Sequence, residues 1–341
     1  MGYRKLFWAG LLVLLLSACG ANPPSVTERA VTLPPSPTHP PTATFTPLPT
    51  APPTATPAPT DTPLPVFTPT PTATNTPVVT TQPPELTAGA TPAAAYTFLP
   101  DPYTVVNVAA DDALNMRAGP GVQFSVVGTL PYFAEGVQIA SAEVMVDGSP
   151  WVPAKYLGTA GWVNRNFLAR QMGYVDEKVA ARAAEIIFAI KNRDMAALST
   201  MVHPQKGVRF SPYTFVDTTG DVVFSAADLP TAMADTTVYL WGAFDGSGEP
   251  INMTFAEYWA RFVYDADFAR PEIIGFNQIV GHGNTINNIA DVYPGAVVVE
   301  YHFSGFDPQY NGMDWRSLRL VLEPFGGEWM LVGIVHDEWT I

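Results

Sequence analysis

Cysteine, positive charge and long hydrophobic runs are all scarce in this sequence. Its 341 residues include one cysteine, Cys19, which excludes an internal disulfide and a cysteine-based zinc cluster. Lysine and arginine number 17 against 31 aspartates and glutamates, and the net charge of -14 argues against nucleic acid or anionic lipid as a partner. Residues 1–100 are neutral in sum, so this negative charge lies in the remainder of the chain.

Motifs of common enzyme classes are missing as well. The chain has no Gly-rich phosphate loop, no nucleophile elbow and no Lys-centred acyl-transfer motif. The segment Gly281-His282-Gly283 lacks the further glycine and the strand-to-helix context that a phosphate loop needs. We therefore expect no cofactor and no metal, and an enzyme only if its site is assembled from residues far apart in the sequence.

The first residues have the three regions of an export signal. Arg4 and Lys5 precede an uncharged segment at residues 6–16, and small residues follow it. About eleven apolar residues at roughly 1.5 Å each cannot cross a hydrocarbon core of ~30 Å, so a permanent membrane span is not expected. Residues 1–18 are therefore predicted to be a signal peptide.

This segment ends in Leu16-Ser17-Ala18-Cys19, which resembles the lipobox of bacterial lipoproteins. The resemblance implies that the Cys19 thiol is acylated and that the signal is cut just before it. The chain would then be lipid-anchored in the cell membrane, facing the exterior of a bacterial cell. Two or more acyl chains, at ~0.8 kcal/mol per buried methylene, give a stable anchor. The alternative is that Cys19 is an ordinary position in a secretory signal, or a buried thiol.

Residues 19–100 contain most of the 35 prolines, set among threonine and alanine. Proline removes backbone donors, and the few apolar residues here have no period of 2 or 3.6, so no core can form. We predict a disordered Pro/Thr-rich linker, extended at about 3.1 Å per residue, between the lipidated Cys19 and the folded domains. Glycosylation of its threonines is left open.

Short β-type runs begin after residue 101, with Gly, Pro and Asp between them. They predict a small all-β barrel over residues 101–171, with strands at residues 103–108, 114–117, 125–130, 136–142, 151–154 and 161–163. Its motifs are Leu114-Asn115-Met116-Arg117-Ala118-Gly119-Pro120-Gly121, Val126-Val127-Gly128-Thr129-Leu130, Trp151-Val152-Pro153-Ala154 and Gly161-Trp162-Val163-Asn164. In this order they resemble the bacterial Src-homology-3-like domain of the b type. The resemblance implies a targeting module for peptidoglycan or its peptides.

Five residues of the barrel are candidates for contact with a wall ligand: Asn115, Arg117, Tyr132, Trp151 and Trp162. Each also has a structural interpretation. Trp162 suits an apolar core position, and Arg117 can brace the neighbouring turn.

Residues 174–341 are predicted to form an α+β domain. Helical periods occur at residues 175–190 and 195–201, and a capping box at Thr254 and Glu257 begins a helix through residue 264. Strands are expected at residues 237–244, 296–303, 318–322 and 329–335, the last two forming a hairpin. This order, closed by a Gly-Gly-x-Trp turn, resembles the nuclear-transport-factor-two-like fold of uncharacterised exported bacterial proteins. The resemblance implies a cone with an apolar mouth that holds a ligand.

Candidate catalytic residues of this domain are His203, Arg209, His302 and His336. His302 and His336 fall on strands expected in one sheet, where histidines can converge as a general base or as metal ligands. The alternative is that the histidines are structural or lie on the surface. A turn that begins at Asp245 suits a hairpin better than a calcium loop, because it lacks the further ligands of an EF-hand.

The sequence therefore predicts a membrane-anchored surface lipoprotein. Its partners would be the lipid bilayer, through acylated Cys19, and peptidoglycan or a wall peptide, through the barrel. The C-terminal domain would bind a ligand or a partner. The alternative is a wall-targeted enzyme of the hydrolase or isomerase type, with its active site in the cone pocket. Polar side chains that converge in one pocket would favour the enzyme, and the oligomeric state is left open.

Overall fold

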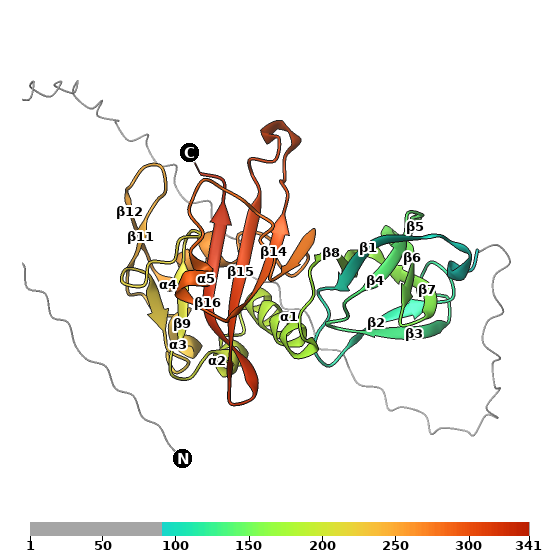
Figure 1. The fold of residues 1–341 in the computed structure, drawn as a ribbon, viewed down its shortest axis with the longest axis horizontal. Helices are drawn as coiled ribbons and strands as arrows, with labels where there is room; N and C mark the ends of the chain where they lie inside the picture. Colours follow the sequence, from blue (N-terminus) through green and yellow to red (C-terminus); the bar gives the residue numbers. More distant parts are fainter. Residues whose placement is uncertain (1–90, 341) are drawn as a thin grey trace, which may run out of the picture. The chain divides into compact units, whose positions relative to one another are not determined.

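The computed structural model describes residues 91–340, so the predicted signal peptide, Cys19 and most of the predicted linker lie outside the described residues. Fourteen strands form one mixed sheet, two more form a separate hairpin, and the helices are few and mostly short. Figure 1 shows strands β1 to β8 gathered on one side of helix α1 and the later strands on the other. Among residues 91–340, no helix is long and apolar enough to cross a membrane.

The N-terminal strands enclose a small core of their own, and this part keeps the name of its predicted fold, the barrel. Its elements are η1 (Ala93–Ala95), β1 (Phe98–Val105), β2 (Ala113–Arg117), β3 (Val126–Pro131), β4 (Val137–Ala140), β5 (Val144–Val146), β6 (Ser149–Tyr156), β7 (Thr159–Asn164), η2 (Arg165–Phe167) and β8 (Leu168–Met172). Along β2, Leu114 and Met116 are buried in this core and Asn115 between them is exposed. This alternation has the period of 2 that the sequence predicted, and the six predicted strands are confirmed with shifted ends.

The C-terminal part contains the longer strands and most of the helices. Its elements are α1 (Glu177–Asn192), α2 (Met195–Met201), β9 (Val208–Ser211), β10 (Val222–Phe224), α3 (Leu229–Ala232), β11 (Tyr239–Ala243), β12 (Pro250–Met253), α4 (Phe255–Tyr258), η3 (Trp259–Val263), β13 (Ile273–Phe276), α5 (Ile289–Val292), β14 (Val297–Phe303), η4 (Pro308–Tyr310), β15 (Arg316–Phe325) and β16 (Glu328–Glu338). Four predicted features are confirmed here: α1, α2, the capping box at Thr254 and the β15–β16 hairpin.

Local sequence explains where α1 begins and ends. The Asp176 side chain accepts a hydrogen bond from the backbone N–H of Lys178, and Arg193 ends the helix in the left-handed conformation at φ 53°. Between them, Val179, Ala183 and Ile186 belong to the apolar stripe that is buried against the sheet. The helix therefore covers one face of the sheet.

One sheet continues from the barrel into the C-terminal part through β8. This strand pairs antiparallel with β1 on one side and parallel with β13 on the other. Each of the four residues of β13 is buried, so this strand is covered on both faces. The Tyr132 hydroxyl adds a bond across the junction, since it donates to Glu185 of α1 at 2.9 Å.

Strands β14, β15 and β16 present two different faces. Tyr301, Leu318 and His336 lie opposite one another on the face that packs against α1 and η3, which we call the helix face. His302, Ser317 and Asp337 form the next row and point to the other side, which we call the loop face. Residues 277–296 cover the loop face, for example where the backbone N–H of Gly281 bonds Glu300.

The interior on the helix face is filled by aromatic rings. Phe210, Phe255 and Tyr258 are at most 1% exposed, and Trp241 stacks on Tyr258 with ring centroids 3.8 Å apart. Such rings contribute large buried areas and edge-to-face contacts. Aromatic packing therefore fills this part of the interior.

Candidate functional site

The most open arrangement of predicted ligand residues is a groove on the barrel, with a volume of about 400 Å³. Asn115, Arg117 and Trp151, three of the five predicted positions, line it. We call it the barrel groove. Its remaining walls come from residues around Asn107, Asp112, Val122, Asn164, Phe167 and Phe188. Strands β2, β6 and β7, the turn η2 and helix α1 all contribute to it.

Hydrogen-bonding capacity is unused in the barrel groove. Asn115 is exposed, and among the described residues its amide has no hydrogen-bond partner. Arg117 Nη1 donates to the carbonyl oxygens of Val122 at 3.0 Å and Phe124 at 2.9 Å, which fixes the turn between β2 and β3. Asp112 balances the charge of Arg117, so the groove as a whole is neutral.

Aromatic side chains form the apolar part of the barrel groove. Trp151 is 5% exposed and supplies one wall, while Phe167 and Phe188 supply another. A neutral groove with the free amide of Asn115 beside aromatic walls suits an uncharged, amide-rich ligand, because amides pair with peptide groups and rings pack on small side chains. Asn164, Phe167 and Phe188 were not among the predicted ligand residues.

Tyr132 and Trp162 lie away from the groove. Tyr132 faces α1, where burial and the bond to Glu185 raise the pKa of its hydroxyl to about 12. Trp162 is 1% exposed beneath η1, and its Nε1 donates to the carbonyl oxygen of Thr91 at 3.3 Å. The segment before β1 therefore covers the indole of Trp162, and this residue does not line the barrel groove.

His203 and Arg209 have structural roles. His203 is 4% exposed, and its Nδ1 accepts hydrogen bonds from the backbone N–H groups of Gln205 and Lys206. The Arg209 guanidinium donates to the carbonyl oxygens of Asp217 at 3.1 Å and Asp221 at 3.2 Å. Both side chains hold loops next to β9, and neither lines a cavity described here.

His302 and His336 share one sheet, as predicted, but they point to opposite faces of it. His302 Nδ1 lies 2.9 Å from Ser317 Oγ on the loop face, and burial lowers the His302 pKa. On the helix face, both ring nitrogens of His336 lie 3.3 Å from oxygen acceptors on Pro212 and Asp265. The two histidines therefore cannot act together on one substrate.

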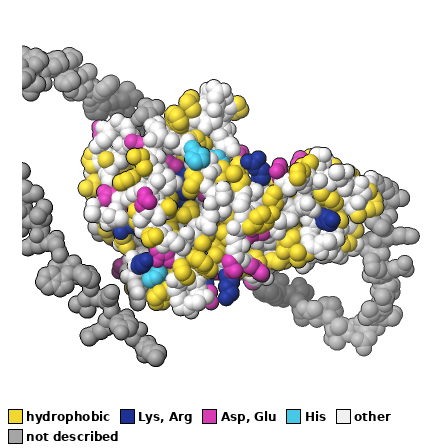
Figure 2. All heavy atoms as spheres, viewed as in Figure 1, with side chains coloured by type: hydrophobic (Ala, Val, Ile, Leu, Met, Phe, Trp, Pro, Cys, Tyr) yellow, Lys and Arg dark blue, Asp and Glu magenta, His cyan; other side chains and the backbone are white. Residues whose placement is uncertain are grey.

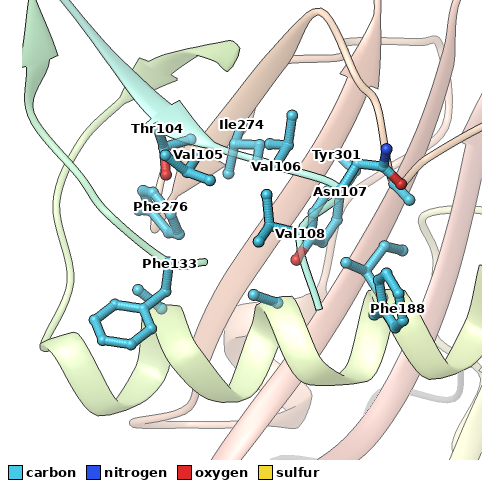
Figure 3. Close-up of a pocket in the computed structure, with 14 residues that line it drawn as sticks. Thr104, Val105, Val106, Asn107, Val108, Phe133, Phe188, Ile274, Phe276 and Tyr301 are labelled. Atoms are coloured by element: carbon cyan, nitrogen blue, oxygen red, sulfur yellow. The ribbon is translucent and has the colours of Figure 1, made fainter. Parts of the chain in front are cut away.

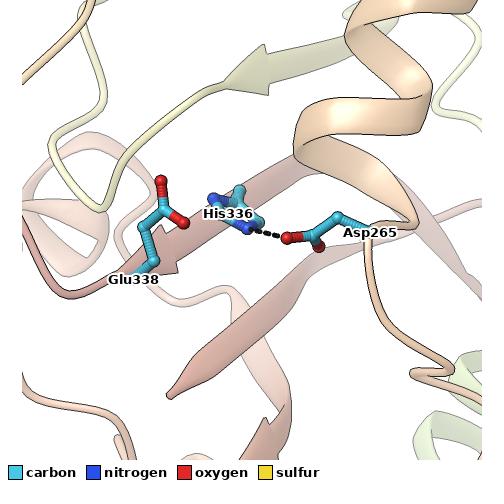
Figure 4. A group of neighbouring side chains, drawn as sticks. All are labelled: Asp265, His336 and Glu338. Carbon is cyan, nitrogen blue, oxygen red and sulfur yellow. Dashed lines mark hydrogen bonds and ion pairs between the residues drawn. The ribbon is translucent and has the colours of Figure 1, made fainter. Parts of the chain in front are cut away.

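Asp265, His336 and Glu338 form a compact group that has the geometry of a metal site (Figure 4). Two guanidinium groups already occupy it, since Arg316 pairs with Asp265 at 2.8 Å and Arg261 pairs with Glu338. Burial raises the pKa of Asp265, but His336 and Arg316 outweigh this effect and hold that pKa below its usual value. The arginines neutralise both carboxylates, so a cation would have to displace them. This group is an ion-pair network.

A second polar network is fully buried on the loop face. Arg319 is 0% exposed and donates to Glu300 at 2.9 Å, to Asp337 at 2.8 Å and to Thr214 at 2.7 Å. Against the effect of burial, Arg319 and Ser317 keep the Glu300 pKa below its usual value, whereas burial raises the Asp337 pKa. With its partners satisfied and no access to solvent, Arg319 connects β14, β15 and β16 and does not meet a ligand.

A small apolar cavity lies where β1 meets α1 and β13 (Figure 3). Val106, Ile274, Phe276 and Tyr301 line part of it, and its volume is about 20 Å³. This is room for about one water molecule, and its walls offer few polar partners. The cavity is therefore a packing defect at the junction and not a ligand site.

Comparison with family models, curated proteins and solved structures found no match to this chain.

Proposed function

We propose that this chain is a membrane-anchored surface lipoprotein that binds the cell wall through a Src-homology-3-like barrel of the b type. In this proposal the C-terminal part is a cone-like domain that binds a ligand or partner without catalysing a reaction. The observation that carries the proposal is the barrel groove. Asn115 and Arg117 on β2 and Trp151 on β6 line one groove of about 400 Å³.

The chemistry of the barrel groove favours a peptide of the wall as its ligand. The groove is neutral, its Asn115 amide is free, and its aromatic walls accept small side chains. A lipid anchor at Cys19 and a long linker would hold the barrel near the wall at high effective concentration. Weak binding by a single groove is then sufficient.

The alternative of a wall-targeted hydrolase or isomerase has less support. Its candidate residues do not meet, because His302 and His336 lie on opposite faces and His203 and Arg209 hold separate loops. A pocket of about 500 Å³ lies beside Trp241 in the C-terminal part, but none of these four candidate residues lines it. A non-catalytic role therefore fits the C-terminal part better.

Sedimentation with purified peptidoglycan tests the binding proposal. We expect the full chain to sediment with peptidoglycan and Asn115→Ala to bind about three- to tenfold more weakly, the effect of one lost hydrogen bond. Asn252→Ala is the matched control, since it removes another exposed strand asparagine, on β12, and should bind as the wild type does. Wild-type protein that stays in the supernatant would overturn the proposal.

Membrane fractionation tests the anchor separately. Cys19→Ser removes the only thiol of the chain, so we expect the protein to move from the membrane fraction to the soluble fraction. If the variant still sediments with membranes, the anchor is not a lipid on Cys19.

A further inference from the structure

A second pocket, of about 380 Å³, lies beside η2 where β8 pairs with β13. Its polar walls are Arg165 and Asn166 from η2, and Arg270 and Glu272 from the segment before β13. We call it the seam pocket. It shares no lining residue with the barrel groove, so an inference about it does not depend on the proposed function.

The charge of the seam pocket is unusual for this chain. Acidic residues outnumber basic ones by 31 to 17, and few Lys and Arg side chains are visible on the face shown in Figure 2. Yet among residues 91–340 neither Arg165 nor Arg270 has a carboxylate within ion-pairing distance. The ion pairs found there use other cations, namely Arg182, Lys206, Arg261, His302, Arg316, Arg319 and His336. Two guanidiniums and one carboxylate, Glu272, leave the pocket with one positive charge.

Arg165 is held in place before any ligand arrives. Its guanidinium carbon lies 4.9 Å from the centre of the Tyr103 ring, and Nη1 donates to the Leu168 carbonyl oxygen. These contacts leave its other N–H donors available. Arg270 is exposed, and within the described part of the chain its guanidinium has no hydrogen-bond partner. The pocket thus pairs a fixed guanidinium with a free one.

Glu272 is also oriented. One of its oxygens, Oε2, accepts a hydrogen bond from the backbone N–H of Ser304 at 3.0 Å, which leaves Oε1 for another donor. A carboxylate in an otherwise basic pocket repels a phosphate dianion and attracts an ammonium group. The pocket therefore complements a ligand that carries both a carboxylate and an amino group.

We infer that the seam pocket binds a small zwitterionic ligand, either a free amino acid or a whole dipeptide. Its carboxylate would lie between the guanidiniums of Arg165 and Arg270, with the Asn166 amide as a further donor. Its amino group would bond Glu272. Guanidinium groups match a carboxylate with two parallel hydrogen bonds, and this geometry supplies the specificity.

Calorimetric titration of the full chain with four probes tests the ligand class. The probes are alanine, the dipeptide alanyl-alanine, acetate and inorganic phosphate. We expect saturable binding of alanine or of the dipeptide, and whichever binds tighter identifies the source of the zwitterion. Acetate should bind more weakly than the tighter of these two zwitterions, because it has no amino group to bond Glu272. No binding of either zwitterion, or tighter binding of phosphate, overturns the inference.

Three variants test the residues. Arg270→Gln should weaken zwitterion binding about tenfold or more, while Arg193→Gln, the same charge change on an exposed arginine outside the pocket, should leave it unchanged. Glu272→Gln should weaken binding of the zwitterion and not that of acetate. Because Arg270 has no structural contact to lose, a matching thermal unfolding curve shows that the variant is folded. If Arg270→Gln binds the zwitterion with wild-type affinity, the inference is overturned. The variant should sediment with peptidoglycan as the wild type does, because that binding is assigned to the barrel groove.

Discussion

The barrel and the C-terminal part use their polar side chains in opposite ways. In the barrel groove, Asn115 and part of the Arg117 guanidinium have no partner among the described residues. On the loop face of the C-terminal part, Arg319 is buried and bonded to Glu300, Asp337 and neighbouring groups. The same residue types therefore serve two purposes. A polar group without a protein partner in an open groove is available to a ligand, whereas a bonded polar group in the interior holds the fold together.

The largest expected effect comes from breaking the buried network. Arg319→Met leaves Glu300 and Asp337 buried without a counter-charge, and we expect it to cost about 3 to 5 kcal/mol of unfolding free energy. The same substitution in the barrel, Arg117→Met, removes bonds at a half-buried turn and should cost about 1 kcal/mol. Urea denaturation of both variants measures the difference.

A triple variant serves as the control for this prediction. Neutralising both carboxylates with Glu300→Gln and Asp337→Asn beside Arg319→Met should restore part of the lost stability, because no buried charge then remains. If Arg319→Met costs no more than Arg117→Met, the contrast between the two regions is wrong.

The segment that covers the buried network should tolerate little added volume. A Cβ on Gly281 would lie 2.5 Å from Ser317 Oγ and 2.6 Å from the Trp315 ring, so Gly281→Ala should cost about 1 to 3 kcal/mol. Gly283 lies on the same segment, but its added Cβ would meet Trp315 at 3.4 Å, an ordinary contact. Gly283→Ala should therefore change stability by less than about 0.5 kcal/mol in the same denaturation assay. Equal costs for the two alanines would contradict the close packing inferred here.

Glu135, at the junction of the two regions, should give stability a pH dependence. Burial raises the pKa of its carboxyl from 4.5 to about 7, although Gln171 donates a hydrogen bond to it at 2.8 Å. The folded state therefore binds more protons than the unfolded state between these values, so stability falls as pH rises through that window and is constant above it. Glu135→Gln should remove this fall in stability. At pH 8 it should raise the unfolding free energy by about 1 kcal/mol, after allowance for solvent screening.

Thermal unfolding between pH 4 and pH 8 measures this effect. Glu143→Gln is the control, since it makes the same charge change at an exposed position of the barrel. An unchanged slope in Glu135→Gln would show that another group is responsible.

Local sequence patterns predicted much of the fold, but they did not predict which distant segments pair with each other. Alternation of buried and exposed residues was sufficient for β2, and two residues were sufficient for the capping box at Thr254. Strand β13 is apolar at every position and is buried on both faces, so its sequence has no alternation to detect. Its parallel pairing with β8, about a hundred residues earlier in the chain, follows from tertiary packing.

The candidate sites show the same division. Motif residues on β2 and β6 line one groove together, but Phe188 reaches this groove from helix α1. Phe188 lies outside the buried stripe of that helix, and an aromatic residue in such a position is a signal that could have found it. The failure of His302 and His336 to converge has a different cause. Whether two strand residues share a face depends on the register through the strand between them, which composition does not reveal.

The smallest expected effect on stability is at Asn115, and it tests the comparison most directly. Asn115 is exposed and its amide has no partner within residues 91–340, so Asn115→Ala should change the unfolding free energy by less than about 0.5 kcal/mol. The same variant should bind peptidoglycan more weakly, because the amide it removes is available only to a ligand.

Ser317→Ala on the loop face is the opposite case, since Ser317 is buried and its hydroxyl donates to Glu300 at 2.6 Å. This variant should lose about 1 to 3 kcal/mol of unfolding free energy without affecting wall binding. If Asn115→Ala instead destabilises the chain and leaves binding unchanged, the barrel groove is structural in the same sense as the buried network.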